Sequence, residues 1–189
     1  GQATSPWFVM EMIRQLYDVR RIDITDSEID DDVDILMIVH PQEISDQMLY
    51  AIDQHILRSG LAVVFLDPNA DSLVTRSPQG ALIPASMESD LRVLLSAWGV
   101  NYQDDMVLAD NELALRVRMS QNDRPMPHLG MIGVPRKNLD QEDIITSRLE
   151  TINFASAGVL SQADDATTLF EPLIRSSADA MLMDAVLVE

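Results

Sequence analysis

Two short apolar runs limit what this chain can fold into. They cover Ile35–Val39 and residues 61–66, and neither run alternates between apolar and polar residues. Such a run predicts a strand that is buried on both faces, as in a parallel sheet. Residues 45–58 between them have the apolar spacing of an amphipathic helix. We therefore expect a strand–helix–strand unit whose two strands are adjacent, parallel and nearly fully buried.

The ends of these segments are also marked. Ser45 is a suitable N-cap, and Ile44 and Leu49 occupy the positions of a hydrophobic staple. Gly60 is a typical residue just beyond the end of a helix. Pro41 stops the first strand, because proline cannot donate to a strand ladder.

The remaining chain gives weaker signals. A first helix is expected after Ser5 and Pro6, followed by a short strand over residues 19–24, and another helix is expected over residues 89–99 with Ser89 as its cap. Residues 67–88 look like a long loop, and residues 122–140 are interrupted by three prolines and two glycines. Strands are expected within 105–119, 150–161, 167–177 and 180–188. The predicted fold is a three-layer α/β domain, flavodoxin-like or class I glutamine-amidotransferase-like, with a mostly parallel sheet and an irregular second half.

Composition narrows the classes of partner. The 189 residues carry a net charge of −18, and the 13 Lys and Arg residues are scattered, which excludes a basic surface for nucleic acid or anionic lipid. The chain has no cysteine, which excludes disulfides and thiolate chemistry. Six acids between Asp26 and Asp34 lack the glycine and closing glutamate of an EF-hand loop, so we interpret them as a solvated connector.

Three polar residues follow the two predicted strands. His40 comes after the first strand, and Asp67 and Asn69 come after the second. Ligands of open α/β sheets bind beyond the carboxyl ends of the strands, so these residues are candidates for one ligand-binding crevice. The alternative is that all three only build turns, for which Asp, Asn and Pro are well suited.

No motif of catalysis is present. We find no nucleophile elbow, phosphate-binding loop or zinc-protease motif, and the three histidines, His40, His55 and His128, lie in different predicted elements. The sequence therefore predicts no catalytic residue, no metal site and no cofactor.

The segment "DDVDILMIVHPQEISDQMLYAIDQHILRSGLAVVFLDPNAD" resembles the soluble domain of the GldG-type auxiliary proteins of bacterial ABC transporters. Later segments, "LLSAWGVNY", "LALRV", "INFASAGVL" and "PLIRSS", are similar to the same family. The resemblance extends from about residue 6 to residue 176.

This resemblance carries expectations of its own. It implies a membrane-tethered protein with a large extracytoplasmic part, which works beside a separate ATPase and permease; one branch is associated with gliding motility. A related domain in an intraflagellar transport protein suggests protein–protein interaction. The implied fold is similar to flavodoxin-like or class I glutamine-amidotransferase-like domains. The amidotransferase nucleophile is a cysteine, which this chain lacks.

Together these observations predict one extracytoplasmic α/β domain over residues 1–189, excised from a longer membrane-anchored protein. We expect it at the periplasmic, extracytoplasmic face of the inner membrane as a non-catalytic auxiliary subunit. Its expected partners are the permease and ATPase subunits and a small ligand. The alternative is a hydrolase or transferase that acts on a small or sugar-like substrate at the carboxyl edge of the sheet.

Overall fold

A computed structural model describes residues 7–58, 60–70, 88–118 and 124–187, and the backbone of two short strands at 75–76 and 82–83. The chain divides into two compact units, Gly1–Asp34 with Ile44–Gly60, and Ile35–Glu43 with Leu61–Glu189. None of the helices in the described ranges is long and apolar enough to cross a membrane. The secondary structure, in chain order, is α1 (Phe8–Leu16), β1 (Ile35–Val39), α2 (Asp46–Leu57), β2 (Leu61–Phe65), β3 (Thr75–Arg76), β4 (Leu82–Ile83), α3 (Arg92–Ala97), β5 (Val100–Tyr102), β6 (Met106–Asp110), β7 (Ala114–Val117), β8 (Met126–Pro135), the 3-10 helix η2 (Arg136–Asn138), β9 (Thr151–Ala155), β10 (Leu160–Gln162), β11 (Ala180–Asp184) and the 3-10 helix η3 (Ala185–Leu187).

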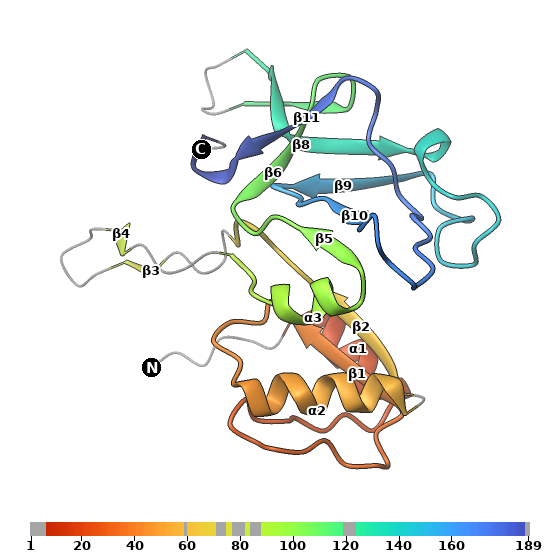
Figure 1. Ribbon diagram of the computed structural model, residues 1–189. Coiled ribbons are helices and arrows are strands. Elements are labelled where there is room, and N and C mark those ends of the chain that lie inside the picture. Colours follow the sequence, from red (N-terminus) through yellow and green to blue (C-terminus); the bar gives the residue numbers. More distant parts are fainter. Residues whose placement is uncertain are drawn as a thin grey trace. The chain divides into compact units, whose positions relative to one another are not determined.

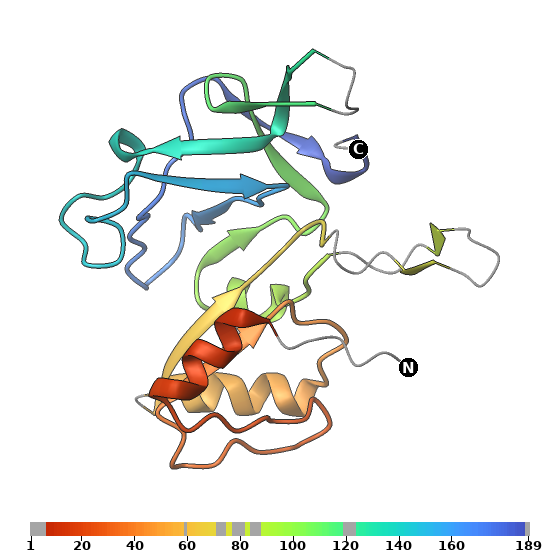
Figure 2. The same cartoon turned by 180° about the vertical axis from the view of Figure 1, so that it is seen from behind.

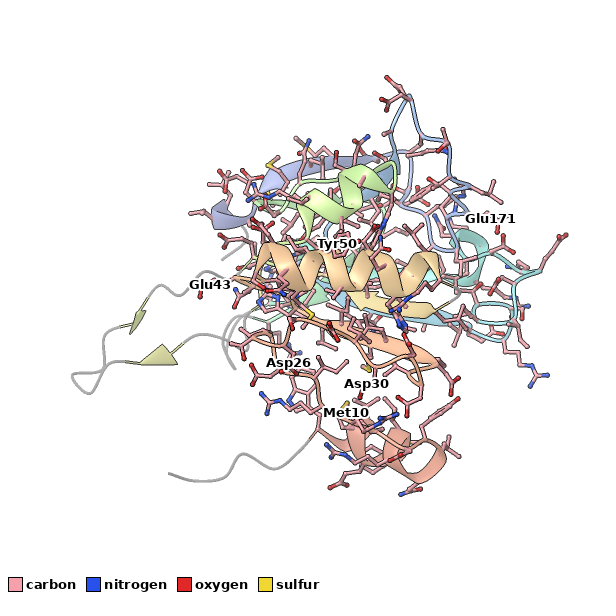
Figure 3. The ribbon with its side chains drawn as sticks, turned by 60° about the horizontal axis from the view of Figure 1, so that its bottom comes forward. Met10, Asp26, Asp30, Glu43, Tyr50 and Glu171 are labelled. Carbon is pink, nitrogen blue, oxygen red and sulfur yellow. The ribbon has the colours of Figure 1, made fainter. Side chains whose placement is uncertain are left out.

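The first unit consists of α1, an acidic connector and α2. The hydroxyl of Ser45 accepts a hydrogen bond from the Met48 N–H at 3.2 Å, as the sequence predicts for an N-cap. The connector that carries Asp26 and Asp30 contains no strand at residues 19–24, so that prediction is wrong (Figure 3). Two arginines form ion pairs with acids of the connector: Arg20 pairs with Asp32 at 2.9 Å, and Arg58, the residue following α2, pairs with Asp31 at 2.7 Å.

The helix α1 differs from the expectation in its start and its burial. It begins at Phe8 with Trp7 as N-cap, whereas Ser5 and Pro6 lie outside the described residues. Phe8, Met12 and Leu16 lie at the i, i+4, i+8 spacing of one helix face, and all three are exposed. Helical spacing alone therefore identified the helix but not a buried face.

The strands β1 and β2 are adjacent and parallel, as predicted, with Ile35 opposite Leu61 and Val39 opposite Phe65. The expectation of nearly complete burial is wrong. Side chains alternate along both strands, and one face of the ribbon is exposed, with Ile35 44% and Leu61 65% accessible. An unbroken apolar run does not specify two covered faces, because side chains on a strand alternate between faces whatever their polarity.

The rest of the second unit is antiparallel, which corrects the predicted fold class. Every strand pair of the described chain other than β1–β2 is antiparallel: β3 with β4, β5 with β10, β6 with β11, and β7 and β9 on either side of β8. The molecule is α/β with few helices and mostly antiparallel sheets, and it is not a flavodoxin-like or amidotransferase-like parallel sheet. Figures 1 and 2 show β8 and β9 lying side by side in opposite directions.

The longest strand, β8, forms where the sequence suggests interruption by proline. Pro127 pairs with β7 alone and Pro135 pairs with β9 alone, so each proline stands where β8 has one neighbour. Close packing explains the glycine at position 133, because a Cβ there would lie 2.8 Å from the Leu115 side chain. A hydrophobic core forms on this sheet from Leu113, Ile132, Val134 and Leu139.

Two further expectations in this unit have mixed outcomes. The strands predicted within 105–119, 150–161 and 180–188 are present as β6, β7, β9 and β11, with β10 beginning at the end of the second range. Residues 167–177 form no strand, only an isolated bridge between Ile174 and Leu139. The helix expected from Ser89 begins at Arg92, with Leu91 as N-cap.

Candidate functional site

The carboxyl ends of β1 and β2 define the candidate site. The His40 N–H donates to the Phe65 carbonyl at 2.9 Å and continues the ladder by one residue. The backbone of His40 then turns into the left-handed region, with φ at 46°. Residues other than glycine seldom adopt this conformation, and it ends the extended backbone of the strand at His40.

Ser89 joins the two strand ends. Its hydroxyl oxygen lies 2.8 Å from Nδ1 of His40 and accepts a hydrogen bond from the Asp67 N–H, also at 2.8 Å. The Ser89 N–H in turn donates to the Asp67 carbonyl at 2.8 Å. A residue 22 positions further along the chain thus ties the end of β2 to the end of β1, and its side chain is 0% exposed.

Two more hydrogen bonds hold the segment around Ser89. The Asp90 N–H donates to the Pro41 carbonyl at 2.7 Å, and the Gln42 amide Nε2 donates to the Glu88 carbonyl at 3.1 Å. Residues 88–90 are therefore hydrogen-bonded to the ends of both strands, and we call these three residues the strap.

The hydrogen bonds of Ser89 determine the tautomer of His40 in the neutral ring. Because the Ser89 oxygen already accepts from the Asp67 N–H, we assign its O–H as the donor to Nδ1. The ring proton is then on Nε2, which is buried and has no partner among the described residues. Buried donors in native proteins are usually satisfied by protein, water or ligand.

The structure places the three predicted site residues differently. It brings His40 and Asp67 together through Ser89, whereas Asn69 is tied locally, its backbone N–H donating to the Asp67 carboxylate at 2.9 Å. That bond builds the turn that the sequence allowed as an alternative. Neither of two surface hollows in this unit is lined by the three residues. Ligand binding by His40, Asp67 and Asn69 stays a prediction.

Tyr102 on β5 adds a second buried polar atom. Its hydroxyl has no partner among the described residues. Burial raises the pKa of this hydroxyl, and the negative charges of Asp104, Asp67 and Glu88 raise it further. Tyr102 therefore remains a neutral donor at physiological pH. A Cβ at Gly158 would approach the Tyr102 ring to 3.0 Å, so glycine allows this close packing.

Sequence reasoning missed Ser89 and Tyr102 as members of this cluster. The sequence predicts Ser89 as a helix cap, because serine before an apolar helical pattern has that role most often. Tyr102 lies in a three-residue strand whose position against Pro68 follows only from the tertiary structure. No local pattern in the sequence predicts the contacts of Ser89 with His40 and Asp67 or the position of Tyr102.

The chemical capacity of the cluster is limited by access. A serine beside a histidine suggests a nucleophile and its base, but the Ser89 side chain is fully buried and its oxygen already accepts a backbone hydrogen bond. In the described ranges, no three His, Asp or Glu side chains are arranged to hold a metal ion. The arrangement fixes a strand end, and its two buried donors, on His40 and Tyr102, have no partner among the residues that the structure describes.

The fold is thus a small parallel ribbon joined to antiparallel sheets, with a hydrogen-bonded polar cluster where the parallel strands end. Residues 2–188 match the family model described as "ABC-type uncharacterized transport system", so the chain belongs to this family of auxiliary components of ABC transport systems. Comparisons with curated proteins and with solved structures gave no significant match.

Proposed function

We propose that the chain is a non-catalytic, GldG-type auxiliary subunit on the extracytoplasmic side of an ABC transporter, where it binds the permease. Membership of the family of transport auxiliaries supports the association with a transporter. The non-catalytic part of the proposal depends mainly on one observation, the complete burial of the Ser89 hydroxyl beside His40.

The alternative, a hydrolase or transferase at this edge, needs a reactive group that a substrate can reach. The serine–histidine pair is the nearest approach to such a group at the strand ends. However, a nucleophilic hydroxyl must contact the substrate and be relieved of its proton by a base. Ser89 instead forms hydrogen bonds to His40 and to the backbone of Asp67. This supports a structural role, in which Ser89 holds the two strand ends together.

The exposed face of the β1–β2 ribbon favours binding to a protein. Apolar side chains occupy this face along both strands, and contiguous exposed apolar surfaces are commonly covered by partners. The chain's large negative charge excludes most nucleic-acid and lipid alternatives. The exposed members of this face are Ile35, Met37, Val39, Leu61, Val63 and Phe65.

Co-purification with the transporter tests the proposal. We expect the full-length protein to retain the permease and ATPase subunits, and Val63→Asp to abolish this retention. Val93→Asp on α3 is the matched control, because Val93 is also exposed and lies outside the ribbon. Equal retention by both variants would remove the ribbon face from the interface.

A turnover screen addresses the enzymatic alternative. Purified protein is assayed for ATPase, esterase, phosphatase and glycosidase activity, and we expect none. Turnover that disappears in His40→Ala or Asp67→Ala would overturn the non-catalytic proposal. Thermal melts of both variants separate loss of activity from loss of fold.

A further inference from the structure

The loop between β8 and β9, residues 136–150, is closed at its base. The Arg136 N–H donates to the Glu150 carbonyl at 2.9 Å, and the Arg136 guanidinium pairs with the Glu150 carboxylate at 3.2 Å. The amide nitrogen of Gln141 donates to the Arg136 carbonyl at 2.7 Å. Figure 1 shows this loop at the end of the two strands. Compact surface loops whose ends meet and whose own side chains hold them are frequently functional.

Hydrogen bonds also hold the tip of the β8–β9 loop. The Asp140 carboxylate accepts the N–H groups of Glu142 and Asp143 at 2.8 and 3.2 Å. The Thr146 hydroxyl donates to the Asp140 carbonyl at 2.7 Å, and Thr146 is 2% exposed. The Asp143 carboxylate accepts the Ile145 N–H at 2.7 Å. The backbone that carries residues 144 and 145 is therefore held from both sides.

The apolar residues of this loop divide into two pairs. Leu139 belongs to the hydrophobic core of the sheet, and Leu149 packs against that core. Ile144 and Ile145 are 86% and 69% exposed. Single exposed apolar residues are normal, but here two neighbouring ones stand at the tip of a loop that other contacts already hold. A tip held in this way loses little conformational entropy when it binds, which favours a role as an anchor for a partner.

The charge around the tip selects the kind of partner. Residues 140–148 contain three acids, Asp140, Glu142 and Asp143, and one base, Arg148. The whole chain carries −18, so like charge opposes both a second copy of this chain and an anionic lipid surface. An apolar pocket with a rim of basic side chains complements the tip in both respects.

We infer that Ile144 and Ile145 insert into an apolar pocket with a basic rim on the membrane subunits of the transporter. The two isoleucines supply the buried apolar surface, and the exposed Glu142 faces the rim. The identity of the partner rests on the proposed function. The contact itself is separate from the ribbon face and deepens that function by a second anchor.

Aspartate substitutions at the tip test this anchor. The full-length protein is immobilised, and the purified permease–ATPase complex in detergent is titrated by biolayer interferometry. Ile144→Asp and Ile145→Asp should each weaken binding by about tenfold or more, because each brings a charge into an apolar pocket. Val93→Asp on α3 is the matched control, since Val93 is exposed and β-branched, and it should bind as the wild type does. Thermal melts should show little change for any of the three variants, because each site is exposed.

Glu142→Gln tests the basic rim. It should slow association and reduce the dependence of the association rate on salt, while the dissociation rate changes little. An unchanged association rate at every salt concentration would contradict the basic rim.

The possible results separate this inference from the proposed function. If the wild type binds and both isoleucine variants bind as tightly as Val93→Asp, the anchor is overturned and the proposed function stands. If the wild type does not bind the complex, the proposed function fails and takes this partner with it. Sedimentation that shows self-association, or flotation with anionic vesicles, would also overturn the inference if the isoleucine variants abolish it, because the tip would then serve a second copy or a membrane.

Discussion

The β1–β2 ribbon and the β7–β8–β9 sheet show how little apolar content says about burial. The ribbon contains the most continuous apolar runs of the chain, yet one of its faces is exposed. The sheet contains two glycines and two prolines within β8, yet it carries the core residues Ile132 and Val134, which are 2% and 1% exposed. Burial follows what packs on the face of a strand, and Ile132 and Val134 pack with Leu113 and Leu139 in the core of this sheet.

Paired isoleucine substitutions test this comparison most severely. Ile132→Ala should lower the free energy of unfolding by about 2–5 kcal/mol, because it leaves a cavity in the core. Ile35→Ala should lower it by less than about 1 kcal/mol, because 44% of its surface is already in water. Denaturant melts of both variants provide the measurement, and equal losses would contradict the contrast between the regions.

The buried carboxylate of Asp110 should make the next largest contribution to the free energy of unfolding among the antiparallel sheets. Burial alone would raise the pKa of Asp110, but hydrogen bonds from the Ser177 N–H and hydroxyl and from the Leu113 N–H lower it overall. Asp110→Asn should cost about 2–4 kcal/mol at neutral pH, because an amide cannot accept all of these bonds.

The same carboxylate predicts a pH dependence. A carboxyl group with a lowered pKa in the folded state stabilises the fold fully above its unfolded pKa of about 3.9, and this contribution is lost as the pH falls through the folded-state pKa. Asp110→Asn should therefore flatten the acid limb of a stability–pH curve.

At the β1–β2 ribbon, the substitution of Ser89 should lower the free energy of unfolding the most. Ser89→Ala leaves the Asp67 N–H and the His40 Nδ1 without partners, which should cost about 2 kcal/mol. Ser161→Ala on exposed β10 should cost less than about 0.5 kcal/mol. Thermal melts that give the same small shift for both serines would show that the strap is dispensable.

The smallest effect should come from the surface of the antiparallel half. Glu112→Gln removes the ion pair with Lys137, both partners of which are largely exposed, and should change stability by no more than about 1 kcal/mol. The effect should shrink further in high salt. A change above 2 kcal/mol in urea melts would mean that this pair is coupled to the core.

Parts of the fold were predictable because they depend on local signals. The Ser45 cap fixes the start of α2, and the two apolar runs separated by a helix specify the parallel pairing of β1 and β2. The strand β8 was not predictable, because its prolines are tolerated only through the offset of its two neighbours. Offsets between strands distant in sequence leave no trace in a local pattern.

The site was predictable to a similar extent. The position of His40 and Asp67 at neighbouring strand ends follows from the parallel pairing. Their connection does not, because it depends on Ser89, which stands 22 residues after Asp67 in the sequence.

The central position of β8 has a consequence for local unfolding. Residues 126–128 and Ile132 pair with β7, and residues 131–135 pair with β9, so neither outer strand can keep its hydrogen bonds once β8 detaches. The three strands should therefore open as one cooperative unit, and their slowest amide protons should exchange with deuterium at a common free energy.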